Sequence, residues 1–92
     1  NMNYKTVDLK KTGTQIETIC RENGYNAIEI ASSLNVSHQS VYKWFSGKSL
    51  PTLDNVLFLS QLLKVRVEDF IVYEEVTYPS FHIKEFVDYV YA

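Results

Sequence analysis

The segment from His38 to Phe45 carries the side chains best suited to specific chemistry. If it forms a helix, its apolar residues face the core and five polar or amphipathic side chains face outward. Each of the five can form a directional hydrogen bond, and none is acidic. They are His38, Gln39, Ser40, Tyr42 and Lys43. Such a set suits the recognition of a polar surface more than it suits catalysis.

The sequence contains no constellation typical of an active site. His38 and His82 lie in unrelated segments, and the single Cys20 has no His or Asp partner at a catalytic spacing. No glycine-rich loop could cradle a phosphate, and no His and Cys cluster has the spacing of a metal site. We therefore expect no enzymatic activity, no cofactor and no metal. Cys20 is predicted to be a thiol of the core.

Length and composition bound the architecture. The 92 residues have room for one small domain, and a hydrophobic content of 46% is sufficient for a packed core. The longest purely apolar run spans only residues 56–59, far below the ~20 residues of a membrane span. With no membrane span, no secretory leader and no pair of cysteines, the sequence predicts a cytoplasmic protein.

Hydrophobic periodicity predicts five short helices in a compact, all-α core. The first is expected to start near residues 12–14. Asn26 and Glu29 have the spacing of a capping box before the second helix. Ser37 and Thr52 are placed to cap the third and fourth helices. The four later helices are expected at residues 27–34, 38–45, 53–63 and 67–71.

The two ends of the chain are predicted to lie outside this core. Residues 1–11 have no long periodic pattern and are expected to form an N-terminal arm, which leaves residues 12–72 as the domain. Residues 73–92 form an acidic, aromatic tail that starts with a strand-like segment and continues with a helical pattern after Pro79. Because this region is rich in aromatic residues, it is expected to pack on the core or on another subunit.

The second and third predicted helices meet the steric demands of a helix-turn-helix. The helices cross at close range, and the small Ala31 stands at the expected point of contact. Asn35 in the turn tolerates a positive φ, and Val36 is placed to fill the turn. Trp44 has the spacing of a core residue, so packing is a better interpretation than base stacking. The other inward positions are Ile30, Leu34, Val41 and Phe45.

About residues 12–71 resemble the Cro/CI-type, or lambda-repressor-like, helix-turn-helix family, also called XRE-like. The matching segment is ENGYNAIEIASSLNVSHQSVYKWFSGKSLPTLDNVLFLSQLLKVRVEDFI, and its most specific part is SVYKWFSGKSLPTLDN. Asn35 stands where the family usually has Gly. Ala27 stands where many members carry a polar side chain that contacts phosphate. The resemblance implies a compact five-helix DNA-binding domain.

The resemblance also implies that the helix 38–45 enters the major groove of double-stranded DNA while the preceding helix crosses the backbone. Gln39 can then form a bidentate contact with adenine, which discriminates against other bases by ~1–3 kcal/mol. The residues implied as base contacts are His38, Gln39, Ser40 and Lys43. The residues implied as phosphate contacts are Asn26, Ser37, Tyr42, Lys48, Ser49 and Thr52.

One such domain reads only a few base pairs, so a homodimer on a pseudo-palindromic operator is predicted. The implied function is a sequence-specific transcriptional regulator, with repression as the simplest mode. The predicted dimer interface combines the fifth helix and the tail through Val67, Phe70, Ile71, Phe81, Phe86 and Val90. The alternative is an antitoxin or a protein-interaction adaptor with the same fold, whose tail would bind a protein partner.

The charge distribution separates the domain from the tail. The whole chain has a net charge of −2, which taken alone argues against a nucleic-acid partner. Residues 1–66 carry eight basic and five acidic residues, whereas residues 67–92 carry one basic and six acidic residues. The resulting charges of +3 and −5 predict modest non-specific DNA affinity, with the tail directed away from the DNA.

Overall fold

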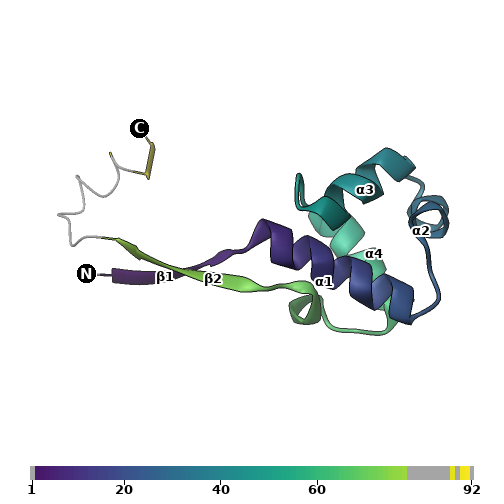
Figure 1. Cartoon of the computed structure of the whole chain (residues 1–92), viewed down its shortest axis with the longest axis horizontal. Coiled ribbons are helices and arrows are strands. Elements are labelled where there is room, and N and C mark those ends of the chain that lie inside the picture. Colours follow the sequence, from purple (N-terminus) through teal and green to yellow (C-terminus); the bar gives the residue numbers. More distant parts are fainter. Residues whose placement is uncertain (1, 79–87, 89, 92) are drawn as a thin grey trace.

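A helical body and a narrow two-stranded ribbon that projects from it make up the structure (Figure 1). The computed structural model describes residues 2–78, 88, 90 and 91. The elements in chain order are β1 Met2–Val7, α1 Leu9–Glu22, α2 Ala27–Leu34, α3 His38–Ser46, α4 Leu53–Leu63, the 3-10 helix η1 Val67–Phe70 and β2 Tyr73–Tyr78. The described residues therefore contain four α-helices and a sheet. The predicted all-α class misses this sheet, and the fifth predicted helix is a single 3-10 turn.

The helix-turn-helix forms from local signals that the sequence displays. The side chains of Asn26, Ser37 and Thr52 each accept a hydrogen bond from the backbone N–H three residues later, at 2.8, 3.1 and 3.3 Å. Asn35 has a φ of 56°, which is the left-handed conformation expected in the turn after α2. These caps and this turn confirm the predicted bounds of α2 and α4, and α3 extends one residue beyond its predicted end.

α1 begins about one turn earlier than the sequence predicts. Its N-cap is Asp8, whose carboxylate accepts a hydrogen bond from the backbone N–H of Lys11 at 2.9 Å. Thr12 and Gly13, which the sequence indicates as a start signal, instead lie inside the helix and are buried. The predicted start is wrong because Thr12 and Gly13 serve the packing of α1 against its neighbours and do not cap the helix.

Gly13 lets α1 pass very close to the end of α3. A Cβ atom at this position would lie 2.8 Å from the carbonyl oxygen of Phe45 and 2.9 Å from the backbone nitrogen of Gly47. It would also collide with the carbonyl oxygen of Trp44. Gly47 ends α3 with a φ of 77° and lies against the backbone of Lys10 in the same contact. The two glycines therefore set the distance between α1 and α3.

The core lies between the helices and joins all of them. Trp44 is only 5% exposed, which confirms its interpretation as a packing residue, and Cys20 is completely buried, as predicted. The buried hydrophobic residues are Ile16, Cys20, Ala27, Ile30, Ala31, Val41, Trp44, Phe45, Leu59, Leu63 and Phe70. Because α3 contributes three of these, its position is fixed by the core while its other side stays open.

The ribbon is formed by the two ends of the described chain. β1 and β2 pair antiparallel, with Met2 opposite Tyr78 and Val7 opposite Tyr73. The strand-like start of the tail is thus confirmed. In the predicted N-terminal arm, residues 2–7 form a strand that pairs with a segment far away in the sequence, and residues 9–11 belong to α1.

Thr12 joins this ribbon to the body. Its hydroxyl accepts a hydrogen bond from the N–H of Val72 at 2.9 Å and donates one to the carbonyl of Val72 at 3.2 Å. The same carbonyl accepts a hydrogen bond from the N–H of Asp8 at 2.8 Å. Gln15 adds a hydrogen bond to the carbonyl of Asp69 at 3.2 Å. One side of α1 therefore holds the start of β2 where it leaves the body.

Most of the predicted tail helix lies outside the described residues. This applies to residues 79–87, 89 and 92, and so to the expected contacts of Phe81 and Phe86. Val90 is described and is 51% exposed. Within the described part of the chain, no helix is both long enough and apolar enough to cross a membrane.

Candidate nucleic-acid interface

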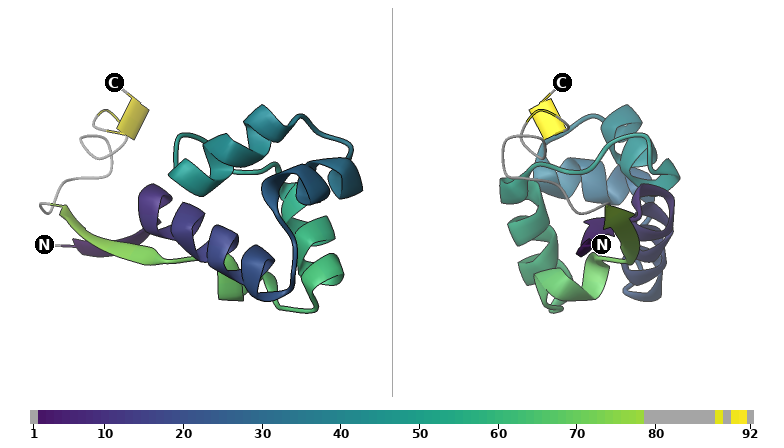
Figure 2. Two further views of the ribbon diagram at one scale, coloured as in Figure 1. Left: turned by 45° about the vertical axis from the view of Figure 1, so that its right-hand side comes forward. Right: turned by 90° about the vertical axis from the view of Figure 1, so that its left-hand side faces the viewer.

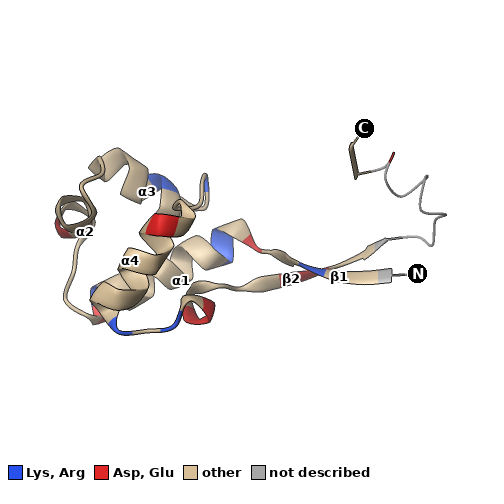
Figure 3. Ribbon diagram, turned by 180° about the vertical axis from the view of Figure 1, so that it is seen from behind, with Lys and Arg blue, Asp and Glu red and all other residues tan. Residues whose placement is uncertain are grey.

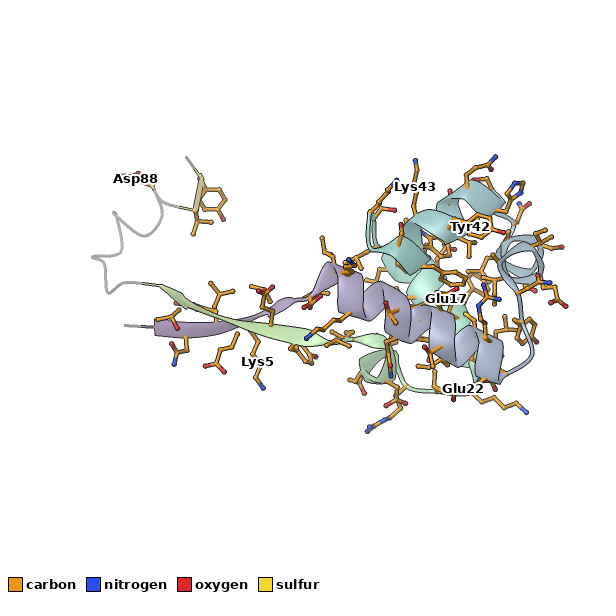
Figure 4. The ribbon with its side chains drawn as sticks, viewed as in Figure 1. Lys5, Glu17, Glu22, Tyr42, Lys43 and Asp88 are labelled. Atoms are coloured by element: carbon orange, nitrogen blue, oxygen red, sulfur yellow. The ribbon has the colours of Figure 1, made fainter. Side chains whose placement is uncertain are left out.

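The outward surface of α3 presents four of the predicted contact residues together. His38, Gln39, Tyr42 and Lys43 are all exposed. The ring of Tyr42 stands edge-on to that of His38, with 6.2 Å between the ring centroids. α3 lies along the outside of the body when the molecule is turned (Figure 2), and Lys43 extends away from the core (Figure 4). This surface is therefore open to a partner along the length of the helix.

Ser40 lies at the edge of this surface rather than on it. Ser40 is half-buried, its hydroxyl lies 2.9 Å from the hydroxyl of Ser37, and its N–H donates to the same Ser37 oxygen at 3.1 Å. The two serines thus satisfy each other at the start of α3. The structure brings His38, Gln39 and Lys43 together as candidates for base contacts and places Ser40 beside them.

Asn26 lies at the amino end of α2, where a phosphate contact is predicted. Its Oδ1 accepts a hydrogen bond from the N–H of Glu29, and the carboxylate of Glu29 accepts one from the N–H of Asn26 at 3.0 Å. Asn26 keeps its Nδ2 group as a donor for phosphate. Its backbone N–H is already used, however, and Glu29 brings a negative charge to the same helix end. This end alone is therefore a weaker anion site than the sequence suggests.

The loop after α3 carries the second group of predicted phosphate contacts. The backbone N–H groups of Lys48 and Ser49 donate to the carbonyl of Lys43 at 2.9 and 3.4 Å, which closes the loop onto the helix. The side chains of Lys48 and Ser49 remain to face a partner, and Lys48 is exposed. Thr52 uses its hydroxyl oxygen as an acceptor at the start of α4, which leaves its O–H as a donor.

An open hollow of about 420 Å³ lies between α1 and the outward side of α3. It brings Lys43 and Lys48, which are predicted as a base contact and a phosphate contact, to one cavity. Figure 4 shows Glu17 on α1 on the side that faces Tyr42. The sequence alone does not indicate Glu17 as a residue of the site. The lining residues are Glu17, Tyr42, Lys43, Phe45, Ser46 and Lys48.

Charge is distributed unevenly over the body. In Figure 3, basic segments lie at the end of α3 and in the loop that follows it, with an acidic segment at the start of α4 beside them. The acidic turn η1 lies on the opposite side of the body and directly follows basic segments. Glu68 and Asp69 supply the acidic charges of η1. Lys64 and Arg66, which precede η1, balance these two acids, and Arg66 lies 3.9 Å from Glu68 and 3.5 Å from Asp69. The attraction of a polyanion to the side of α3 therefore depends on Lys43 and Lys48.

The described dimer residues fall into two groups. Phe70 can contribute little of its side chain to a dimer interface, because it is only 2% exposed and fills the core of its own protomer at the floor of a groove. Val67 and Ile71 are half-buried and line an apolar groove of about 320 Å³ together with Leu50 and Leu53. The prediction of Phe70 is thus corrected, while Val67 and Ile71 border an accessible apolar surface.

Cys20 has the properties of a structural thiol. Burial raises its pKa to about 11, and this effect outweighs the opposing charge of Arg21. A thiol with this pKa is protonated at neutral pH and is a poor nucleophile and metal ligand. Among the described residues, no group of three or more His, Cys, Asp or Glu side chains is arranged to hold a metal ion.

Comparison with known proteins agrees with this geometry. A family model described as helix-turn-helix matches residues 16–70, which is more than half of the chain. The chain therefore belongs to this XRE-type helix-turn-helix family, as the sequence resemblance predicts. Among curated protein sequences, none matches the chain.

Three solved structures share the fold at low sequence identity. The restriction-modification controller protein C.AhdI from Aeromonas hydrophila is 21% identical, with a TM-score of 0.62 over 68% of this chain and 96% of that chain. The SOS-response transcriptional repressor LexA from Eubacterium rectale is 20% identical, with a TM-score of 0.64 over 83% and 81% of the two chains. A transcriptional regulator from Listeria innocua is 18% identical, with a TM-score of 0.62 over 87% and 75%. These neighbours show the shared fold, and membership of the helix-turn-helix family supports a DNA-binding transcription regulator.

Proposed function

We propose that the protein is a sequence-specific transcriptional regulator that inserts α3 into the major groove of a pseudo-palindromic operator and represses by occupying it. The observation that carries this proposal is the open surface of α3. His38, Gln39 and Lys43 lie on this surface, and the residues on the opposite side of α3 are buried in the core. A rigid helix with directional side chains is what base readout requires.

Each group on this surface has a distinct role in the proposal. Gln39, in the first turn of α3, reads adenine through its amide, and Lys43, one turn later, reaches a guanine or the backbone. His38 donates to a base edge, and its ring contact with Tyr42 orients that phenol toward a phosphate. Lys48, Ser49 and the hydroxyl of Thr52 hold the backbone beyond the carboxyl end of α3, while the Nδ2 group of Asn26 holds it at the amino end of α2. The remaining proposed roles belong to Ser37 and Ser40, which stabilise the start of α3.

A second copy of the chain completes the proposed function, because one short recognition helix reads too few base pairs for useful specificity. The apolar surface beside α4 supports such a dimer. Leu53 and Leu50, which line the groove together with Val67 and Ile71, are 75% and 42% exposed, and Leu57, one turn after Leu53, is 46% exposed. This surface begins directly after the phosphate-contacting loop, and a two-fold axis beside it would relate two copies of α3 by the symmetry that a pseudo-palindrome has.

Two substitutions test the proposed DNA contacts. Gln39→Ala is expected to relax the base preference at one position of each half-site, at a cost of ~1–3 kcal/mol on the preferred base. Lys48→Ala is expected to weaken binding to all duplexes alike and to reduce the dependence of log Kd on log salt by about 1. Binding titrations on matched and single-substituted duplexes distinguish the two effects. An equal loss on every duplex from Gln39→Ala would contradict its role as a base reader.

Light scattering tests the proposed dimer. Leu53→Glu places a charge in the exposed apolar lining of the groove and is expected to shift the dimer toward monomer. Phe58→Glu is the matched control, because Phe58 is 61% exposed on another side of α4 and lines no part of the groove. Equal masses for the wild type and for Leu53→Glu at all concentrations would show that this surface does not form the interface.

The antitoxin or adaptor alternative depends on the tail. Residues 79–87 lie outside the described chain, and the described tail residues add no observation that favours a protein partner. The regulator is therefore the one function proposed.

A further inference from the structure

Arg21, near the end of α1, belongs to none of the predicted contacts, yet its side chain is held against α3. Its guanidinium carbon lies 6.0 Å from the centroid of the Phe45 ring. Its Nη2 and Nε atoms lie 2.9 and 3.0 Å from the same carboxylate oxygen of Glu17. The arginine is thus fixed by one contact from its own helix and by one from α3.

These two contacts place Arg21 at the edge of the candidate interface. Glu17 and Phe45 both line the hollow that also contains Tyr42 and Lys43. The two residues that contact Arg21 therefore also line the cavity that contains predicted DNA contacts. About half of the Arg21 side chain, 52%, remains exposed, so the guanidinium is accessible to a ligand.

The end of α1 also lies next to the amino end of α2. The N–H of Gly24 donates to the carbonyl of Arg21 at 3.0 Å, and the N–H of Tyr25 donates to the carbonyl of Cys20 at 3.0 Å. This tight turn leads directly to Asn26, the cap of α2. Glu29 uses the backbone N–H of Asn26 and adds a negative charge there, so a cation beside this end would restore attraction for a phosphate.

We propose that Arg21 contacts a DNA phosphate on the strand that passes the amino end of α2. This inference rests on the proposed function. A guanidinium offers donors along several edges, so an arginine that binds Glu17 along one edge keeps other N–H groups for a phosphate. Because an exposed ion pair of this kind adds little to the stability of a fold, the main effect of Glu17 and Phe45 is to orient the guanidinium.

The test measures the affinity of the full chain for two duplexes of 30 base pairs, one carrying a selected operator and one of scrambled sequence, between 50 and 300 mM KCl. Arg21→Gln is expected to weaken both complexes roughly 5- to 10-fold near 0.1 M salt and to lower the slope of log Kd against log salt by about 1. Arg21→Lys, which keeps the charge, is expected to retain the slope.

Arg66→Gln is the matched control. Arg66 is the other arginine of the chain, it is also paired with acids, Glu68 and Asp69, and it lies at the acidic turn η1. Each Gln variant removes one positive charge, so a general charge effect would give equal slopes for the two. Equal slopes, or a loss restricted to the operator duplex, would overturn the assignment of Arg21 to a phosphate. A wild type that binds neither duplex would overturn the proposed function itself.

Discussion

The helical body and the terminal ribbon are stabilised in different ways. Each helix of the body begins or ends at a local signal, such as the cap Ser37 or the left-handed Asn35, and buries one side in a shared core. The ribbon has two strands from opposite ends of the described chain, and a two-stranded sheet alone is only marginally stable in water. The comparison teaches that the body can hold the candidate interface rigidly, whereas the ribbon depends on the body through Thr12.

The closest contact in the body is expected to give the largest effect. Gly13→Ala should destabilise the protein by about 3 kcal/mol, because the added Cβ meets backbone atoms of α3 that cannot move independently. Thermal unfolding followed by circular dichroism measures the loss. Gly24→Ala is the control. Gly24 has a φ of 84°, and an added Cβ would have no atom within 4 Å. This variant therefore measures only the cost of a left-handed backbone conformation, ~1–2 kcal/mol. Equal losses for the two variants would show that α1 and α3 are not tightly packed.

The buried thiol of the body is expected to make stability depend on pH at alkaline values. In the folded protein the pKa of Cys20 is about 11, above the ordinary value of 9.0. The contribution of the protonated thiol to the free energy of unfolding is therefore fully present below pH 9 and is lost as the pH rises toward 11. The loss amounts to about 2–3 kcal/mol at pH 11. Urea unfolding of the wild type and of Cys20→Ala between pH 8 and 11 gives the free energy of unfolding of each as a function of pH. The loss is the change in the difference between these two curves. Parallel curves would contradict the burial of the thiol.

The joint between body and ribbon is expected to have an intermediate effect. Thr12→Val removes both hydrogen bonds to Val72 and leaves a partly buried N–H without its acceptor, which costs roughly 1–3 kcal/mol. Thr14→Val is the control, because Thr14 is exposed and bonds only within α1, so the change should stay within about 0.5 kcal/mol. Amide exchange of residues 73–78 should accelerate in Thr12→Val alone. Unchanged exchange there would show that the ribbon does not depend on Thr12.

Within the ribbon itself, a substitution is expected to have the smallest effect. The ammonium of Lys5 lies 5.7 Å from the centroid of the Tyr73 ring and opposite Glu75 in the register. The contact with Tyr73 is exposed, so Lys5→Ala should cost only about 0.5–1 kcal/mol in urea unfolding. A loss above about 2 kcal/mol would mean that the ribbon contributes to stability as strongly as the body does.

The same contrast explains which parts of the fold could be predicted. The bounds of α2 and α4 follow from caps and periodicity that lie within a few residues of each other. The ribbon could not be predicted, because nothing near Tyr4 or Lys5 indicates a partner strand at Val76 or Glu75. The early start of α1 could not be predicted for a similar reason. Gly13 resembles a residue that precedes a helix, but it lies inside α1 because of its contact with α3.

The candidate site was predictable to the extent that it lies on one helix. The outward positions His38, Gln39 and Lys43 follow from helical periodicity alone. Glu17 and Arg21 could be paired from their spacing of four residues, but their position beside α3 depends on how α1 packs. Phe70 shows the converse error, since an apolar residue at the end of a domain can belong to the core or to an interface.

Selection of bound sequences from a random pool of duplex DNA tests the central claim most directly. If α3 of two copies reads adjacent major grooves, the enriched sequences will contain an inverted repeat with half-site centres roughly 10 base pairs apart. Gln39→Ala in the same selection should lose the preference at one symmetric pair of positions. Enrichment of no sequence, or of a single unrepeated site, would contradict the account of a dimeric regulator that reads DNA through α3.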